Sequence, residues 1–207
     1  MADDRFRSDA LSLAKAHIEN EPKHGVATSV LSRAQALVQL KAADNTMQRQ
    51  DSNQADQETA IAEEKLKLSL ALNPTDSFLW LMLYSVEVRR SGFDPGKLAR
   101  LDQSYEAGPR EGWIALHRNR VTLAIFSMLN DALQEKAVSE FAAMVDSGFI
   151  KEAAFNLTGA GWVQQDRLLA SLSQVDIVSR EAFAKRLARD GVRVSVPGVE
   201  VDERWWR

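Results

Sequence analysis

Few side chains of this 207-residue chain could perform chemistry. It contains three histidines and no cysteine, so disulfides, thiolate metal sites and thiol nucleophiles are excluded. His17 and His24 have Glu19 and Glu21 between them, but Pro22 breaks any helix that would bring them together. Because no cysteine or third histidine lies nearby, solvent-exposed histidines are a better interpretation than a metal site.

The remaining candidates for chemistry are no stronger. His117 lies in the basic run HRNR, residues 117–120, which reads as a solvated helical face. The run TGAG at 158–161 is rich in glycine but lacks a preceding strand and the lysine of a phosphate-binding loop. We therefore expect no catalytic residue, no metal and no cofactor, and predict that the chain is not an enzyme.

Composition indicates a globular chain with an acidic balance. Apolar residues make up 45% of it, enough for a sizeable core, and the net charge of −3 argues against nucleic acid as the main partner. The longest apolar run, residues 78–84, is far below the ~18–20 residues of a membrane-spanning helix. The acidic start, MADDRFRSDAL, does not resemble a signal peptide. The predicted location is the cytoplasm, or the periplasm if a leader or anchor has been removed.

Helical signals dominate between residues 8 and 190. Apolar residues recur at helical spacing between capping residues, prolines and glycines. The expected helices cover 8–20, 28 to about 43, 60–72, 76–90, 95–107, 109–128, 130–145, 149–157, 163–172 and 179–190. The polar segment 44–59 is interpreted as a solvated loop or frayed helix ends. The sequence thus predicts an all-α fold of antiparallel helices joined by short loops, with a non-repeating bundle as an alternative arrangement.

The end of the chain has a different pattern. Valine alternates with other residues around Pro197-Gly198 in residues 192–201, which predicts extended chain. Pro-Gly favours a type II turn, so both a hairpin and an extended strap along the helices are open.

One interval repeats a known spacing of small and large residues. Pro74 and Pro109 lie 35 positions apart, and each closes one expected helix and opens another. Before Pro74 and after it, the positions that matter are Ala62, Leu66 and Ser69, then Trp80 and Leu83. Small residues let two helices approach closely and bulky residues fill the space between them. Over residues 60–109 this pattern resembles the tetratricopeptide repeat, although Tyr84 stands where that repeat has a small residue.

The resemblance implies a right-handed solenoid of stacked helical hairpins with a concave groove. In the repeat register the groove would be lined by Phe78, Leu81, Ser85, Val88 and Arg89, and then by Trp113, Leu116 and Arg120. Arg89 and Arg120 above an apolar floor suit a peptide that bears a carboxylate. The alternative is that both arginines only solubilise the surface.

The function that the resemblance implies is a non-enzymatic adaptor or scaffold of bacterial type. Such proteins bind a protein or peptide, often as accessory factors of assemblies that include envelope and polysaccharide systems. Nucleic acid, an integral membrane span and a small molecule are not expected as partners, and the oligomeric state stays open. The expected division is a helical repeat domain at 1–174 and a C-terminal helix with its tail at 175–207.

Two alternatives concern the C-terminal part. The terminal DERWWR places Trp205, Trp206 and Arg207 where they could dock the chain on a membrane surface or a partner, or cover an end of the helical stack. Residues 163–201 could instead form a winged helix-turn-helix that binds DNA. Its last helix carries four basic residues, Arg180, Lys185, Arg186 and Arg189.

Overall fold

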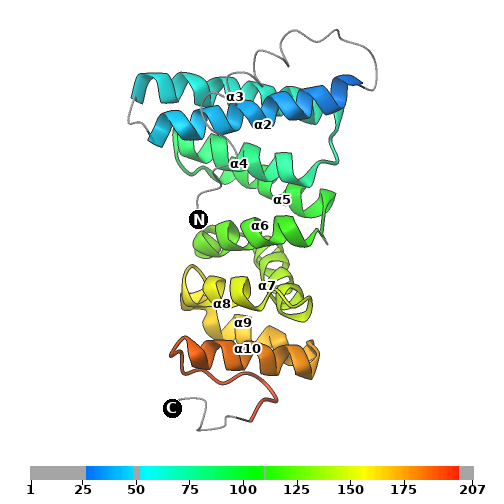
Figure 1. The fold of residues 1–207 in the computed structure, drawn as a ribbon, viewed down its shortest axis with the longest axis vertical. Coiled ribbons are helices and arrows are strands. Elements are labelled where there is room, and N and C mark those ends of the chain that lie inside the picture. The colour runs from blue at the N-terminus through cyan, green and yellow to red at the C-terminus, as the bar shows by residue number, and fades with distance from the viewer. Residues whose placement is uncertain (1–26, 49–51, 110, 201–207) are drawn as a thin grey trace. The chain divides into compact units, whose positions relative to one another are not determined.

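The computed structural model of the chain describes residues 27–48, 52–109 and 111–200, and within these every regular element is a helix and none is a strand. The all-α prediction is confirmed (Figure 1). The chain forms two compact units, Met1–Gly108 and Pro109–Arg207, each of which is described by itself. The expected first helix, 8–20, lies outside the described residues.

Unit 1 is a succession of antiparallel helices. Its elements are α2 (Ala27–Gln48), α3 (Ser52–Leu72), α4 (Ser77–Ser91), the 3₁₀ turn η1 (Pro95–Lys97) and α5 (Leu98–Ala107). α2 lies along α3, α3 packs against α4, and α4 packs against α5 (Figure 1). Each helix therefore contacts its neighbour in the sequence, as short connections require.

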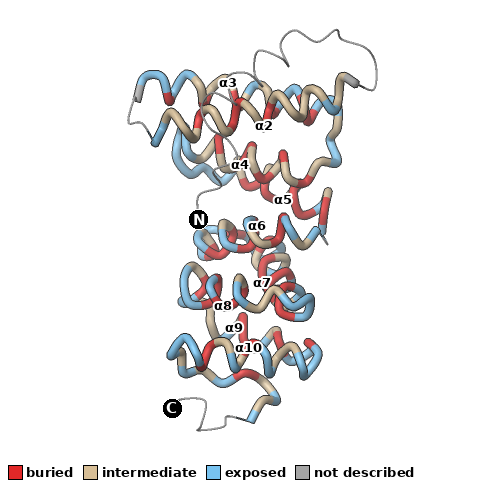
Figure 2. The backbone as a smooth tube through the Cα atoms, viewed as in Figure 1, coloured by how far each residue is buried: buried red, intermediate tan, exposed pale blue. Residues whose placement is uncertain are grey.

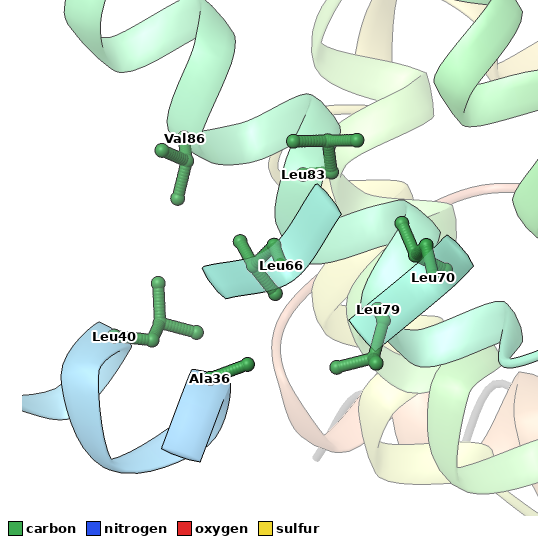
Figure 3. Close-up of a cluster of buried hydrophobic side chains, with 7 residues drawn as sticks. All are labelled: Ala36, Leu40, Leu66, Leu70, Leu79, Leu83 and Val86. Atoms are coloured by element: carbon green, nitrogen blue, oxygen red, sulfur yellow. The ribbon is translucent and has the colours of Figure 1, made fainter. Parts of the chain in front are cut away.

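Aliphatic side chains of α2, α3 and α4 form one core cluster in unit 1. Figure 3 shows Leu66 of α3 between Leu40 of α2 and Leu83 of α4. Trp80 packs against this cluster, and its indole N–H donates to the Pro74 carbonyl over 2.8 Å. The full cluster consists of Ala36, Leu40, Leu66, Leu70, Leu79, Leu83 and Val86. The contact between Leu66 and the helix after the proline, expected from the sequence, is thus part of the core.

The prediction for residues 44–59 was wrong over most of that segment. α2 continues to Gln48 and α3 already begins at Ser52, well before the expected start at residue 60. The first turns of α3 pack through small side chains, because Ala55 and Thr59 are buried. Gln39 of α2 also donates a hydrogen bond to the Glu58 carboxylate. Helices that pack through alanine, threonine and glutamine lack the large apolar stripe on which the sequence interpretation relied.

The predicted boundaries of α4 are confirmed at both ends. α3 ends at Leu72, just before Asn73-Pro74. Asp76 is the N-cap, and its Oδ1 accepts a hydrogen bond from the Leu79 N–H over 3.1 Å. Gly92 ends the helix with a φ of 77°, a conformation that side chains with a Cβ rarely adopt.

Ion pairs connect the helices of unit 1 at its surface. Glu63 of α3 pairs with Lys67 and, over 2.5 Å, with Arg90 of α4. Burial raises the pKa of the Glu63 carboxyl, but the hydrogen bonds and positive charges of Lys67 and Arg90 outweigh it and bring the pKa below its usual value. Between α2 and the start of α4, Arg33 contacts Asp76, the N-cap of α4, over 2.6 Å. These ion pairs fix the orientation of helices that the apolar packing already holds together.

Unit 2 also consists of short helices. Its elements are α6 (Gly112–Ala124), η2 (Phe126–Met128), α7 (Asp131–Asp146), α8 (Ile150–Thr158), η3 (Trp162–Gln164), α9 (Gln165–Ser171), η4 (Leu172–Gln174) and α10 (Ile177–Arg189). α6 packs against α7 and α8, α8 against α10, and α7 against α9. Figure 2 shows buried and exposed residues alternating along α6, α7 and α8, so each has one face toward the core of the unit.

The unit boundary differs from the expected division at 174/175. α10 packs against α7 and α8, so it belongs to the same compact unit as the helices before it. Its start also differs, because Asp176 caps it and its first residue is Ile177, two positions before the expected start at residue 179. A short helix with few apolar residues cannot bury them alone, and this one uses Phe183 and Leu187 for the shared core.

Residues 192–200 contain neither helix nor strand. A turn lies at Pro197-Gly198, where the Val199 N–H donates to the Val196 carbonyl over 3.1 Å and Gly198 has a φ of 72°. Val196 is buried, and Arg180 of α10 donates to the Pro197 carbonyl over 2.6 Å. This part of the chain therefore packs on α10, and no hairpin forms within it.

Candidate functional site

The basic run at 117–120 is divided between surface and core. His117 and Arg120 are exposed, whereas Arg118 and Asn119 have no exposed surface. The prediction of a solvated helical face was therefore wrong for two of its four residues. Polar side chains are buried on the inner face of a helix only where they form hydrogen bonds, and Arg118 and Asn119 both do.

The buried partner of Arg118 is Glu140 of α7. The guanidinium donates from Nε over 2.9 Å and from Nη2 over 2.6 Å, both to Oε1 of the carboxylate. The side chains are 0% and 4% exposed. Beside the pair, Asn119 donates to the Ala137 carbonyl over 2.8 Å and accepts from Asn156 of α8 over 3.1 Å. One polar network thus holds α6, α7 and α8 together inside unit 2.

A pocket of about 250 Å³ lies next to this network. Its lining comes from the segment before α6, from α6 and α7, and from the turn after α7, and consists of Pro109, Gly112, Ala115, Glu140, Ala143, Met144, Ser147 and Phe149. A Cβ at position 112 would lie 2.9 Å from Phe149 Cε2, so glycine permits this close approach. Sites for drug-sized ligands occupy about 300–1,000 Å³, and this smaller, mostly apolar space fits a single side chain better than a cofactor.

The outer face of α6 carries the residues that the sequence assigned to a groove. Trp113 is 48% exposed, Leu116 is half-buried and Arg120 is exposed. The Arg120 guanidinium lies 5.1 Å from the ring centroid of Phe155, an α8 residue that is 57% exposed. The predicted residues therefore lie on one side of α6, and Phe155 joins them from the neighbouring helix.

The groove residues expected from α4 are less accessible. Phe78, Ser85 and Val88 are half-buried, and Ser85 donates to the Leu81 carbonyl over 2.9 Å. Leu81 has no exposed surface, which corrects its assignment as a groove residue. Leu81 lies on the buried side of α4 and is therefore part of the core.

Arg89 at the end of α4 is exposed but has a carboxylate partner. Its Nη1 lies 2.5 Å from Asp44 Oδ1 on α2, with both side chains partly exposed. Such surface pairs contribute about 0–1 kcal/mol, so a binding partner could displace Asp44 at small cost. Arg89 and Arg120 thus differ in their surroundings: a carboxylate lies beside the first and an aromatic ring beside the second.

No protein-family model, curated protein or solved structure matches the chain. The resemblance to the tetratricopeptide repeat consequently rests on the residues given above.

The other expected sites can be placed only in part. Trp205, Trp206 and Arg207 lie outside the described residues. In the DNA-binding alternative, Arg180 donates to the Pro197 carbonyl and Arg186 pairs with Asp190 over 2.7 Å, so two of the four basic residues of α10 have internal partners. Within residues 27–48, 52–109 and 111–200, no cluster of histidine and carboxylate side chains could hold a metal ion. In that same part of the chain, no helix combines the length and apolarity needed to cross a bilayer.

Three residues of the candidate site were not found from the sequence. Glu140 was indistinguishable from other charged residues, because only packing shows that it faces Arg118. Phe155 lies in a helix with a clear apolar pattern, and such a residue is usually assigned to the core. A charged residue at a position of the apolar repeat is the one signal that could have identified Arg118.

Proposed function

We propose that this protein is a non-enzymatic adaptor that binds a protein or peptide on exposed helical faces. The observation that carries the proposal is the outer face of α6, where Trp113 and Arg120 are exposed together. Tryptophan and arginine are the residue types that contribute most often to the energy of protein interfaces. The faces of α6 that are not exposed are occupied by the core and by the Arg118–Glu140 network.

The arrangement of unit 2 supports the proposed solenoid. α6, α8 and α10 contact one another in succession, and α7 contacts α9, so alternate helices are neighbours. Stacked helical hairpins have this relationship between alternate helices. The small residues Ala62 and Ser69 of α3 are buried in unit 1, as the tetratricopeptide pattern requires.

The test is a pull-down from the native host with the chain as bait. The double variant Arg89→Glu with Arg120→Glu is expected to lose the specific partners, because one exposed cation on α4 and one on α6 would each become a negative charge that repels acidic groups of a partner. Its thermal unfolding should stay nearly unchanged, since both arginines are exposed.

A variant with the same change in charge serves as the control. Arg186→Glu with Arg189→Glu alters two residues near the end of α10 and should capture the same partners as the wild type. Unimpaired capture by the Arg89 and Arg120 double variant would refute the proposed surface.

A further inference from the structure

We propose that one face of unit 2 binds an acidic peptide segment that also carries apolar side chains. This α6–α8 face consists of Trp113, His117 and Arg120 on α6 with Lys151 and Phe155 on α8. Carboxylates of the peptide would pair with Arg120 and Lys151, and its apolar side chains would pack on Trp113 and Phe155. The inference rests on the proposed adaptor function and names the chemistry of the partner.

The five residues lie on one continuous surface. Trp113, His117 and Arg120 are spaced by four and three positions, which places them on one stripe of α6. Lys151 and Phe155 are spaced by four positions on α8, and all five residues are exposed. The Arg120 guanidinium over the Phe155 ring connects the two stripes.

The charge of this face is positive in an otherwise acidic protein. The sequence of α6, GWIALHRNRVTLA, contains no aspartate or glutamate. The one carboxylate of α8, Glu152, is half-buried, next to the exposed Lys151. A partner segment with negative charges would therefore meet complementary charge here, although the whole chain has a net charge of −3.

The two cations of the face differ in their partners from three arginines elsewhere on the surface. Arg89, Arg90 and Arg167 each pair with a carboxylate. By contrast, within the part of the chain that the structure describes, no carboxylate forms an ion pair with Arg120 or Lys151. A new carboxylate can therefore pair with these cations without displacing an existing partner.

Arg120 is also held in place before binding. A guanidinium over an aromatic ring gains about 0.5–1 kcal/mol at an exposed site, and its N–H groups stay available at its edge for a carboxylate. Phe155 and Trp113 are 57% and 48% exposed, so the aromatic surface next to these donors can be covered by a partner. Aromatic anchors beside an arginine are typical of the centre of a protein interface.

The same observations favour a peptide over nucleic acid or a membrane. Nucleic-acid binding draws on many phosphate contacts, and this face has only two strong cations. Association with an anionic bilayer likewise needs clusters of basic residues, usually four or more. Two cations and two aromatic rings exposed on one face match a short segment in which acidic and apolar residues alternate.

The experiment measures binding of two labelled synthetic peptides to the full chain by fluorescence anisotropy. The first alternates glutamate with leucine and phenylalanine, and the second replaces each glutamate with glutamine. We expect the acidic peptide to bind more tightly, with an affinity that falls as salt is added, because its contacts are partly ionic. Arg120→Glu should weaken binding about tenfold or more, and Phe155→Leu by a smaller factor.

Arg189→Glu is the matched control, because it makes the same change at an exposed arginine of α10 outside this face and should alter the affinity less than about twofold. Circular dichroism and thermal unfolding check that each variant is folded. Equal binding of the two peptides, equal losses in Arg189→Glu and Arg120→Glu, or binding only to phosphatidylserine vesicles would each overturn the inference. If Arg120→Glu still captures the host partners and the double variant does not, the α6–α8 inference fails while the adaptor proposal stands.

Discussion

At the scale of single residues, Arg118 and Glu140 form a buried ion pair in unit 2. Both charges are removed from water and compensate each other through two hydrogen bonds to one carboxylate oxygen. A buried pair of this kind stabilises little compared with well-packed apolar residues, but loss of one partner leaves an uncompensated buried charge.

Arg118→Met is therefore expected to lower the free energy of unfolding by about 3–5 kcal/mol. The double variant Arg118→Met with Glu140→Leu should recover most of this loss, because it removes both charges. Urea denaturation followed by circular dichroism provides the measurement. A double variant less stable than the single one would show that the pair itself, and not charge compensation, stabilises the unit.

Tyr84 is buried, and among the residues that the structure describes its hydroxyl has no hydrogen-bond partner. Replacement by phenylalanine removes this unsatisfied group and keeps the ring. Tyr84→Phe should therefore be as stable as the wild type at neutral pH or more stable by up to about 1 kcal/mol. The urea midpoints of the two proteins at neutral pH test this expectation.

The same residue predicts a dependence on alkaline pH. Burial raises the pKa of the Tyr84 phenol above its usual 10.0, so the unfolded chain ionises first as the pH rises. The stability present below pH 10 is then lost as the pH increases toward the folded pKa. Tyr84→Phe lacks this loss, and the difference in stability between variant and wild type should grow above pH 10. A constant difference over that range would contradict the burial of the phenol.

Among the elements, α4 depends on a single residue at its start. Asp76 accepts the Leu79 N–H and also pairs with Arg33 of α2 over 2.6 Å. Loss of an N-cap costs about 0.5–2 kcal/mol, and loss of a partly exposed ion pair adds about 0–1 kcal/mol.

Asp76→Ala should thus destabilise the chain by roughly 1–2 kcal/mol. Asp76→Asn is the matched variant, because asparagine caps helices equally well but has no charge, and it should cost less than about 1 kcal/mol. Chemical denaturation of both variants separates the cap from the ion pair. Equal costs would assign the effect to the ion pair.

For the whole molecule, the distribution of charge bears on the DNA-binding alternative. The chain is acidic overall, and Arg180 and Arg186 of α10 have partners within unit 2. We expect no binding of random duplex DNA in a gel-shift assay at physiological salt, because too few free cations remain for phosphate contacts. Binding that weakens steeply with salt would restore the alternative.

Much of the fold could be predicted because its signals are local. Asn73-Pro74, Asp76 and Gly92 act through the conformation and hydrogen bonds of a few neighbouring residues, and the helix boundaries at these points were predicted correctly. Segment 44–59 was mispredicted because its helices pack through small and polar side chains. That such side chains are buried becomes visible only when the partner helix is in place.

What the sequence determined by itself was the all-α class and the position of most helices. The tertiary structure decided which of the charged residues are buried. Arg118 and Arg120 are two positions apart in one helix. Arg118 is buried and pairs with Glu140, whereas Arg120 is exposed and lies over the ring of Phe155. Such pairs join residues more than 20 positions apart. Local spacing in the sequence therefore cannot show them, because they form only when the helices pack together.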